Sequence, residues 1–267
     1  MNTIKNERSE FVYQVAALAL AFIVVHIVYV GVVRPNADAV MKERAELMAT
    51  DTNYVEERSV WIVIKDYEQE SCFVLMLWAF AIMGLKATRA RSEQSLLDRG
   101  LINISEGTKV LPVDARKLAR PIEQLDSSQQ KYLLPRAILR GLQRFGSGGT
   151  IQEVSNSVQE VCDNESQRLD SELAMVRYIA WAIPSIGFIG TVRGIGTALA
   201  NAQEAVNGDI AGVTASLGVA FNSTFIALLI SIVIMFLSHQ LTLIQERSVM
   251  ESREYLDREL LQYMETN

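Results

Sequence analysis

The chain is poor in the residues that build disulfide scaffolds and nucleic-acid interfaces. It has two cysteines among 267 residues, Cys72 in an apolar block and Cys162 in a charged region. We expect two separate, buried or inert thiols, because these surroundings argue against a disulfide, a redox pair or a metal site. Basic residues are interleaved with acidic ones and the net charge is −6. Nucleic acid is therefore not an expected partner, because phosphate binding needs a concentrated basic face.

Charged stretches alternate with blocks that contain almost no charge, and no strand pattern, low-complexity run or internal repeat is evident. Hydrophobic residues make up 49% of the chain, while 21% of the residues are still charged. Segregation of this kind is typical of an integral membrane protein, and it excludes a single soluble core.

The first two apolar blocks predict two membrane spans. Residues 11–33 carry no formal charge and would form a helix of about 35 Å, which is long enough to span a bilayer. A signal peptide is the alternative, because residues 37–39 resemble a cleavage site, but the block is too long for a signal sequence. Residues 72–85 give a helix of only about 21 Å. We count them as a span because the basic residues at 86–91 form a cytoplasmic anchor.

The third and fourth blocks, residues 178–201 and 216–237, contain Arg193 as their single charge. The link between them has Glu204 and Asp209 but no lysine or arginine, whereas the region after residue 85 is rich in arginine. The positive-inside rule therefore places the link outside and both termini in the cytoplasm. The predicted topology has four spans, an outer loop at 34–70, an outer link at 203–215, and cytoplasmic parts at 86–177 and after His239.

The cytoplasmic parts are predicted to be helical. Residues 150–153 have the form of a capping box, and apolar residues recur after them at steps of three and four. One long helix is therefore expected to enter the membrane as the third span, and the fourth span is expected to continue below the bilayer. Residues 114–145 are also helix-like, but we expect breaks at Pro121 and Pro135.

The predicted fold is an all-α polytopic membrane protein with four transmembrane helices. Its third and fourth helices extend into a cytoplasmic helical domain. The chain divides into a first hairpin with a periplasmic loop (1–86), a cytoplasmic region (87–177), a pore-lining helix pair (178–238) and a cytoplasmic extension (239–267).

Ionisable residues inside the apolar blocks are functional candidates, because charge in a membrane is costly. His26 and Arg193 occur there, and the blocks contain no aspartate or glutamate. A proton pump acting alone normally needs a carboxylate relay, so we expect another chain to supply the acid. Arg193 lies about 200° around a helix from Thr191, at roughly 100° per residue. We therefore expect Arg193 to pair with an acid on a neighbouring helix rather than to line a polar path.

The third block carries a face of small residues, and the fourth carries a row of polar ones. Small residues let helices approach closely, which predicts a surface for helix packing or assembly, and hydroxyls can bond a neighbour or hold water. Serine and threonine also satisfy themselves on the preceding turn, so Asn222 is the residue that most requires protein or water beside it. The predicted packing residues are Pro184, Gly187, Gly190, Gly194 and Ala198, and the polar residues that would line half of a path are Asn222, Ser223, Thr224 and Ser231.

Two motifs resemble the paired signature of the MotA/TolQ/ExbB proton-channel family. Residues 187–194 read GFIGTVRG, which is similar to the family's G-L-x-G-T-V-x-G. Residues 220–228 read AFNSTFIAL, which is similar to A-L-x-x-T-A-x-G-L. The resemblance covers about residues 170–240, and the four-span layout looks more like the MotA branch than the three-span TolQ and ExbB branch.

The resemblance implies a homopentameric ring around a dimer of a partner with one transmembrane helix, in the bacterial inner membrane. An aspartate of the partner would carry the proton, Thr191 and Thr224 would line its path, and proton flow would drive rotation or force on the partner's periplasmic domain. It also implies a channel rather than an enzyme, with no catalytic residues, cofactor or metal. Arg193 stands where the family often has tryptophan, and Phe225 and Ala227 replace a small pair, which favours a narrower or differently hydrated pore.

Two other functions compete with that of a stator-type proton channel. A non-conducting oligomeric scaffold or signal-transducing membrane protein would use the same small-residue packing. A self-sufficient solute transporter is disfavoured, because the spans lack both a carboxylate and an inverted repeat. An adjacent reading frame that encodes a single-span protein with an intramembrane aspartate would distinguish the channel from the scaffold.

Overall fold

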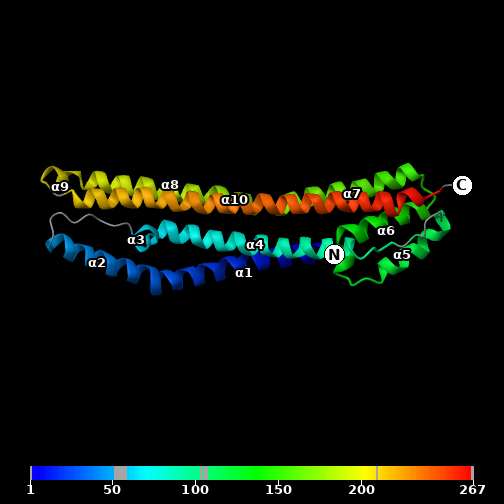
Figure 1. Ribbon diagram of the computed structural model, residues 1–267, viewed down its shortest axis with the longest axis horizontal. Coiled ribbons are helices and arrows are strands. Elements are labelled where there is room, and N and C mark those ends of the chain that lie inside the picture. The colour runs from blue at the N-terminus through cyan, green and yellow to red at the C-terminus, as the bar shows by residue number, and fades with distance from the viewer. Residues whose placement is uncertain (1, 51–58, 103, 105–107, 209, 266–267) are drawn as a thin grey trace. The chain divides into compact units, whose positions relative to one another are not determined.

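The computed structural model describes the whole chain except residues 1, 51–58, 103, 105–107, 209 and 266–267 (Figure 1). Its described part is helical apart from turns, connecting segments and one isolated parallel bridge between Val110 and Met264. The predicted all-α class is therefore confirmed. Two compact units can be separated, Met1–Met83 with Met175–Ser238 and Gly84–Ala174 with His239–Asn267.

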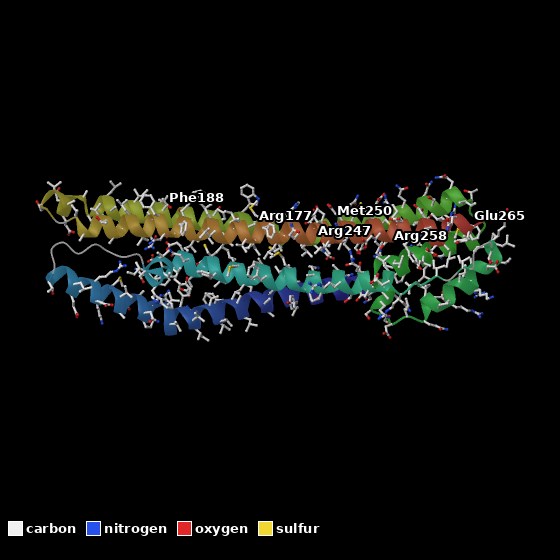
Figure 2. All side chains as sticks on the ribbon, in the orientation of Figure 1. Arg177, Phe188, Arg247, Met250, Arg258 and Glu265 are labelled. Atoms are coloured by element: carbon white, nitrogen blue, oxygen red, sulfur yellow. The ribbon has the colours of Figure 1, made fainter. Side chains whose placement is uncertain are left out.

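Four helices are long and apolar enough to cross a membrane, which confirms the four predicted spanning helices. They begin at Phe11, Tyr67, Ile151 and Ala211. Large apolar side chains of these helices remain exposed, as lipid-facing positions require. Phe188 is an example, and Figure 2 shows it pointing outward from its helix.

The first helix of the first unit continues far beyond the apolar block. Helix α1 (Asn2–Val28), the π-helix η1 (Tyr29–Val33) and α2 (Arg34–Thr50) follow one another without a gap. The expected loop from residue 34 is therefore wrong as far as Thr50, since the sequence there is rich in alanine, methionine, arginine and glutamate, all strong helix formers. The part of this loop at 51–58 lies outside the described residues.

The second predicted span is longer than its apolar block. After the short α3 (Val60–Ile64), helix α4 runs over Tyr67–Leu97, which is 31 residues. Glu68 and Glu70 lie in its first turn, where a negative charge stabilises the helix dipole. Both acids lie ahead of the apolar block, which itself holds no acid, although the spanning helix that contains the block begins at Tyr67.

Helices α8 (Ala174–Ala200) and α10 (Ala211–Glu259) form the remaining pair, joined through α9 (Ala202–Val206). Asp209 of the predicted outer link lies outside the described residues. The 49 residues of α10 give about 74 Å of helix, more than twice the roughly 30 Å of a bilayer core. The predicted continuation of the fourth spanning helix beyond the membrane-length segment is therefore confirmed.

The second unit is built from η2 (Pro112–Asp114), α5 (Ala115–Glu123), η3 (Gln129–Lys131), α6 (Leu133–Gly146), α7 (Ile151–Glu172), η4 (Leu261–Tyr263) and the ends of α4 and α10. The predicted capping box is confirmed: Thr150 Oγ1 accepts from the backbone of Glu153, whose carboxylate accepts from the backbone of Thr150. A buried apolar core that includes Phe145 and Leu256 joins α6, α7 and α10.

Two details of the second unit differ from expectation or refine it. Pro121 does not break α5, because it lies near the end of the helix, which runs on to Glu123. Pro135 lies in the first turn of α6, where no helical partner for its missing N–H is required. Leu173 alone separates α7 from α8, so these two helices are almost continuous, as expected for the helix entering the third span.

Candidate functional site

Helices α8 and α10 approach closely along the small residues of α8. These residues are buried, and Pro184 lies half-buried on the same helix. Helix α10 of the same chain packs against the glycines of α8, so a larger side chain in place of one of these glycines would clash with α10. A methyl group added at Gly187 would lie 2.6 Å from Ala227 Cβ, and one added at Gly190 would lie 2.5 Å from Ser223 Cβ. A methyl group added at Gly194 would lie 2.7 Å from the backbone nitrogen of Ala220. Ala198, one turn further along α8, is also buried.

The close approach brings the hydroxyl of Thr191 on α8 against that of Thr224 on α10. Each hydroxyl also has a backbone acceptor on the opposite helix. Thr191 Oγ1 lies 3.1 Å from the carbonyl oxygen of Ala220, and Thr224 Oγ1 lies 3.1 Å from that of Gly187. Either threonine can therefore donate to the other while the second donates to a carbonyl. The pair can reverse its direction by rotating two O–H bonds, which is the property required of a hydroxyl that relays protons.

The other polar residues of α10 do not share this position. Ser223 donates to the carbonyl of Val219 at 2.8 Å, and its Oγ lies 3.5 Å from the side-chain nitrogen of Gln69. Ser231 lies two turns further along and donates to the carbonyl of Ala180 at 2.8 Å. Asn222 is half-buried, and its side chain has no hydrogen bond to any residue that the structure describes. Its amide is therefore available to another chain or to water.

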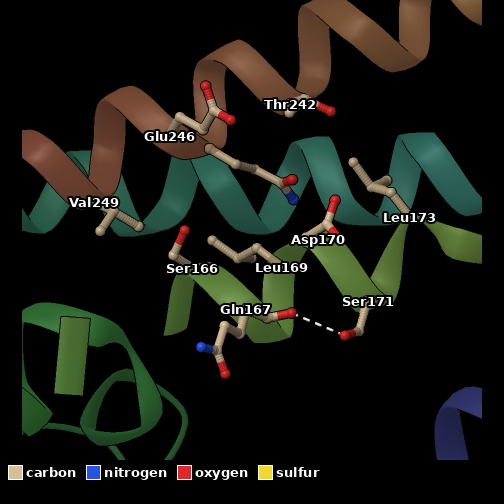
Figure 3. Close-up of a pocket in the computed structure, with 10 residues that line it drawn as sticks. Ser166, Gln167, Leu169, Asp170, Ser171, Leu173, Thr242, Glu246 and Val249 are labelled. Atoms are coloured by element: carbon tan, nitrogen blue, oxygen red, sulfur yellow. Dashed lines mark hydrogen bonds between the residues drawn. The ribbon is translucent and has the colours of Figure 1, made fainter. Parts of the chain in front are cut away.

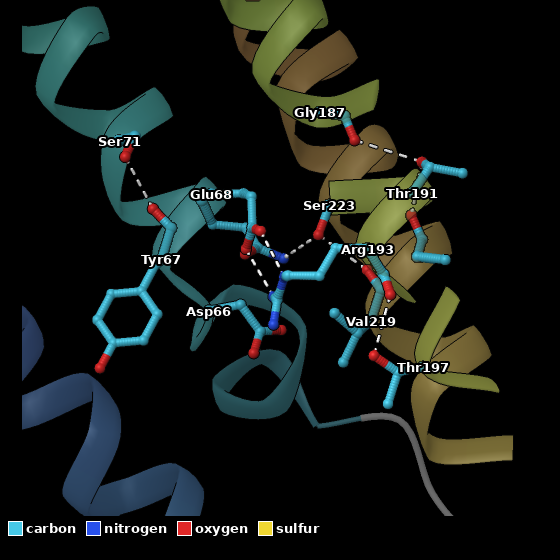
Figure 4. A network of polar contacts seen from close by, with 12 residues as sticks. Asp66, Tyr67, Glu68, Ser71, Gly187, Thr191, Arg193, Thr197, Val219 and Ser223 are labelled. Carbon is cyan, nitrogen blue, oxygen red and sulfur yellow. Dashed lines mark hydrogen bonds and ion pairs between the residues drawn. The ribbon is translucent and has the colours of Figure 1, made fainter. Parts of the chain in front are cut away.

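Arg193 forms a two-pronged ion pair with Glu68 of α4 (Figure 4). Its Nε lies 2.7 Å from Oε1 and its Nη2 lies 2.8 Å from Oε2, which is the strong fork geometry of guanidinium and carboxylate. Glu68 was missed in the sequence because it precedes the apolar block. The acidic run from Asp66 to Glu70, directly ahead of that block, was the signal available.

A second acid of α4, Glu70, is buried between His26 and Arg34 of the first spanning helix. Its Oε1 lies 2.7 Å from Nδ1 of His26, and its Oε2 contacts the guanidinium of Arg34. His26, the other ionisable residue found in an apolar block, therefore also lies beside a carboxylate of α4. Helix α4 thus supplies both acids that meet the charges embedded in the neighbouring spans.

The second unit holds a polar cavity of about 540 Å³ between α7 and α10 (Figure 3). Its wall mixes hydroxyl, amide and acidic groups, including Ser171, whose Oγ donates to the carbonyl of Gln167 at 2.9 Å. Nearby, Lys86 Nζ and Glu172 Oε2 form an ion pair at 2.7 Å with Lys86 almost fully buried. This buried pair ties α4 to α7, while none of the predicted path residues lies in this cavity.

Comparison with known families decides the identity of the segment that carries the threonine pair. The model of the MotA/TolQ/ExbB proton channel family matches residues 129–254, which include α8 and most of α10. Residues 129–254 form a MotA/TolQ/ExbB proton channel family domain. No curated protein and no solved structure matches the chain.

A MotA/TolQ/ExbB proton channel family domain implies a stator-like proton channel role, here in a chain with four helices that could span a membrane. The family is one of inner-membrane transport channels rather than enzymes, and its members work in complexes with single-span partner proteins. The matched segment contains Thr191, Thr224 and Arg193 but not Glu68, Glu70 or His26. The ion pair between Arg193 and Glu68 therefore links the family domain to a helix outside the match.

Proposed function

We propose that this chain is the ring-forming subunit of a stator-type complex that converts proton-motive force into rotation or force on a single-span partner. The observation that carries the proposal is the hydroxyl pair of Thr191 and Thr224, placed at the helix contact inside the proton-channel domain. The pair can pass a proton but cannot hold one as a titratable acid. Glu68, the acid of α4 that reaches α8, is engaged in an ion pair with Arg193.

Energetics favour a carrier supplied by a second protein. Moving one charge through 100 mV yields about 2.3 kcal/mol, which is less than a bare charge costs in hydrocarbon. The carrier must therefore be neutral while it faces apolar surroundings, as a protonated carboxyl group is. Asn222, half-buried and without a partner in the described part of the chain, is suited to receive such a group.

In this proposal the chain lines the proton path and the partner carries the proton. The corresponding assembly is a homopentamer around a dimer of the partner, in the bacterial inner membrane with both termini cytoplasmic. Residues 1–86 and 178–238 would then lie in or near the membrane, and 87–177 and 239–267 would lie in the cytoplasm. Proton flow, rather than an enzymatic reaction or a bound cofactor, would supply the energy.

The test is proton flux in lipid vesicles with a trapped pH-sensitive dye and an imposed gradient. Vesicles that contain this chain alone should show no flux. Flux should appear when a single-span partner with an intramembrane aspartate is added, and it should vanish when that aspartate is changed to asparagine. Selective conductance by this chain alone contradicts the two-component mechanism. A stable complex without flux supports a non-conducting scaffold instead.

A further inference from the structure

The contact between His26 and Glu70 lies where the first and second spanning helices run beside each other (Figure 1). The imidazole Nδ1 and carboxylate Oε1 are 2.7 Å apart, within the distance at which a proton is shared between donor and acceptor. Glu70 is buried, whereas the side chain of His26 is 49% exposed. The pair therefore joins a buried carboxylate to an imidazole ring that is partly exposed at the surface of the chain.

The π-helix η1 sets the position of this pair relative to Arg34. Its widened turn closes with a hydrogen bond from the backbone N–H of Arg34 to the carbonyl of Tyr29. In an uninterrupted α-helix, positions 26 and 34 would be roughly 80° apart around the axis. The one extra residue of a π turn reduces this angle to roughly 20°. His26 and Arg34 can therefore both reach Glu70 from the same face.

A buried hydroxyl without a partner lies at the same place. Tyr29, within η1, is 3% exposed, and its hydroxyl has no hydrogen-bond partner among the described residues. The guanidinium carbon of Arg34 lies 5.8 Å from the centre of its ring. A buried hydroxyl is costly when unpaired, so this one points to a water or hydronium that completes the site.

The charges around the pair are balanced when His26 is neutral. The groups around the pair come from α1, η1, α2 and α4. The cation is Arg34, the acid is Glu70 itself, and the neighbouring aromatic rings are Phe22, Tyr29 and Tyr67. One proton on His26 would therefore be the single charge by which this cluster changes.

We propose that His26 and Glu70 form a proton-binding site built by this chain alone, in which Nδ1 of His26 takes the proton and Oε1 of Glu70 holds the resulting imidazolium. Arg34 opposes this binding, because it occupies the second carboxylate oxygen of Glu70. The use of the proton rests on the proposed function, since a site near the start of α4 would serve proton uptake into the complex. The binding itself does not depend on a partner.

The test uses the full chain in lipid nanodiscs, labelled with ¹⁵N-histidine. His239, the second of the two histidines and exposed, is replaced by glutamine so that His26 gives the single signal. Nitrogen resonances distinguish neutral imidazole from imidazolium, and spectra are recorded from pH 5 to pH 8, the range in which histidine serves as a switch. We expect these spectra to contain the imidazolium signal of His26.

Two neutralising variants give opposite expectations. Glu70→Gln should lose the imidazolium signal, because no carboxylate remains to hold the charge. Arg34→Gln should keep it and strengthen it, because the competing cation is gone. A ring that stays neutral in every spectrum, or variants that behave alike, overturns the proposal. If Glu70→Gln does not fold, the imidazolium signal of Arg34→Gln alone tests the proposal, and its absence overturns it. Because no partner is present, a failure here differs from an absence of flux in the complex.

Discussion

Single hydroxyls can be removed from the threonine pair with little change of shape, since valine resembles threonine but cannot donate or accept. Thr224→Val should leave assembly intact and remove most of the proton flux of the complex, because the relay partner of Thr191 is lost. Thr197→Val is the matched control: its hydroxyl is exposed and bonds only the carbonyl of Arg193, at 3.0 Å. Unimpaired flux in the double variant of Thr191 and Thr224 would remove both from the path.

The pairing of Arg193 with Glu68 is testable by a double-mutant cycle. Arg193→Met and Glu68→Gln should each destabilise the chain, because each leaves a charge without its partner. The double variant should lose less than the sum of the two, with a coupling of about 0.5–1 kcal/mol, since Arg193 is half exposed in the chain. Unfolding in detergent micelles measures all three variants. Strict additivity would show that the fork contributes nothing to stability.

At the residue scale, sequence reasoning identified both sides of the threonine contact but only one side of each contact with an acid. Thr191 and Thr224 stand out in apolar surroundings, and Arg193 and His26 stand out as charges. Their acidic partners were missed, because hydropathy defines a span by its uncharged run, and Glu68 and Glu70 lie ahead of that run. Which acid meets which cation depends on how three helices pack, and periodicity within one helix does not specify that.

The packing of α8 on α10 should depend on which glycine is changed. Gly190→Ala places a methyl group 2.5 Å from Ser223 Cβ, so the two helices must separate, at a cost typical of overpacking of about 1–3 kcal/mol. Gly196→Ala on the same helix meets nothing within 4 Å and should be neutral or stabilising. The midpoints of thermal unfolding compare the two directly. Equal effects would mean that the contact of α8 with α10 is not tight in the native protein.

The π-helix should be removable by deleting one residue. Gly31 is the suitable position, because a side chain there would meet nothing within 4 Å. The deletion should convert η1 into α-helix and keep Arg34 roughly 20° from His26 around the axis, because seven residues at roughly 100° each then separate them. A double-mutant cycle between Arg34→Gln and Glu70→Gln should therefore keep the coupling that it shows in the full-length chain. A coupling that is lost on deletion would show that η1 is not a one-residue insertion in an otherwise regular helix.

At the element scale, the sequence predicted which helices exist better than it predicted where they end. The capping box at Thr150 fixed one boundary, because it is a local hydrogen-bond pattern. The apolar block at 72–85 understated α4, since charged residues with high helix propensity extend a helix without adding hydropathy. The same reason explains why α2 continues to Thr50, where a loop was expected. Pro121 shows that proline near the end of a helix is not a break.

At the scale of the whole molecule, the family match leaves α1 to α5 outside its bounds. The polar network nevertheless reaches beyond those bounds, because Arg193 of the matched domain pairs with Glu68 of α4. Helices α1 and α4 are therefore more than lipid-facing covers for α8 and α10. They contribute the charges that fix α8 and, under the inference drawn above, a proton site of their own.

The orientation of the chain in the membrane is the property on which the direction of proton flow depends. The link that includes Asn207 has Glu204 but no lysine or arginine, whereas the segment that includes Gln130 follows a run rich in arginine. The positive-inside rule therefore places Asn207 outside and Gln130 in the cytoplasm. Asn207→Cys should react with a membrane-impermeant maleimide in intact cells, and Gln130→Cys should react only after permeabilisation.

The two native cysteines do not interfere with this experiment, because Cys72 is 1% exposed, Cys162 is fully buried, and neither forms a disulfide. The native chain, carried through the same labelling, therefore serves as the control. Labelling of Gln130→Cys in intact cells, with Asn207→Cys protected, would reverse the topology. The site at His26 and Glu70 would then face the cytoplasm, at the end of the proton path rather than at its beginning.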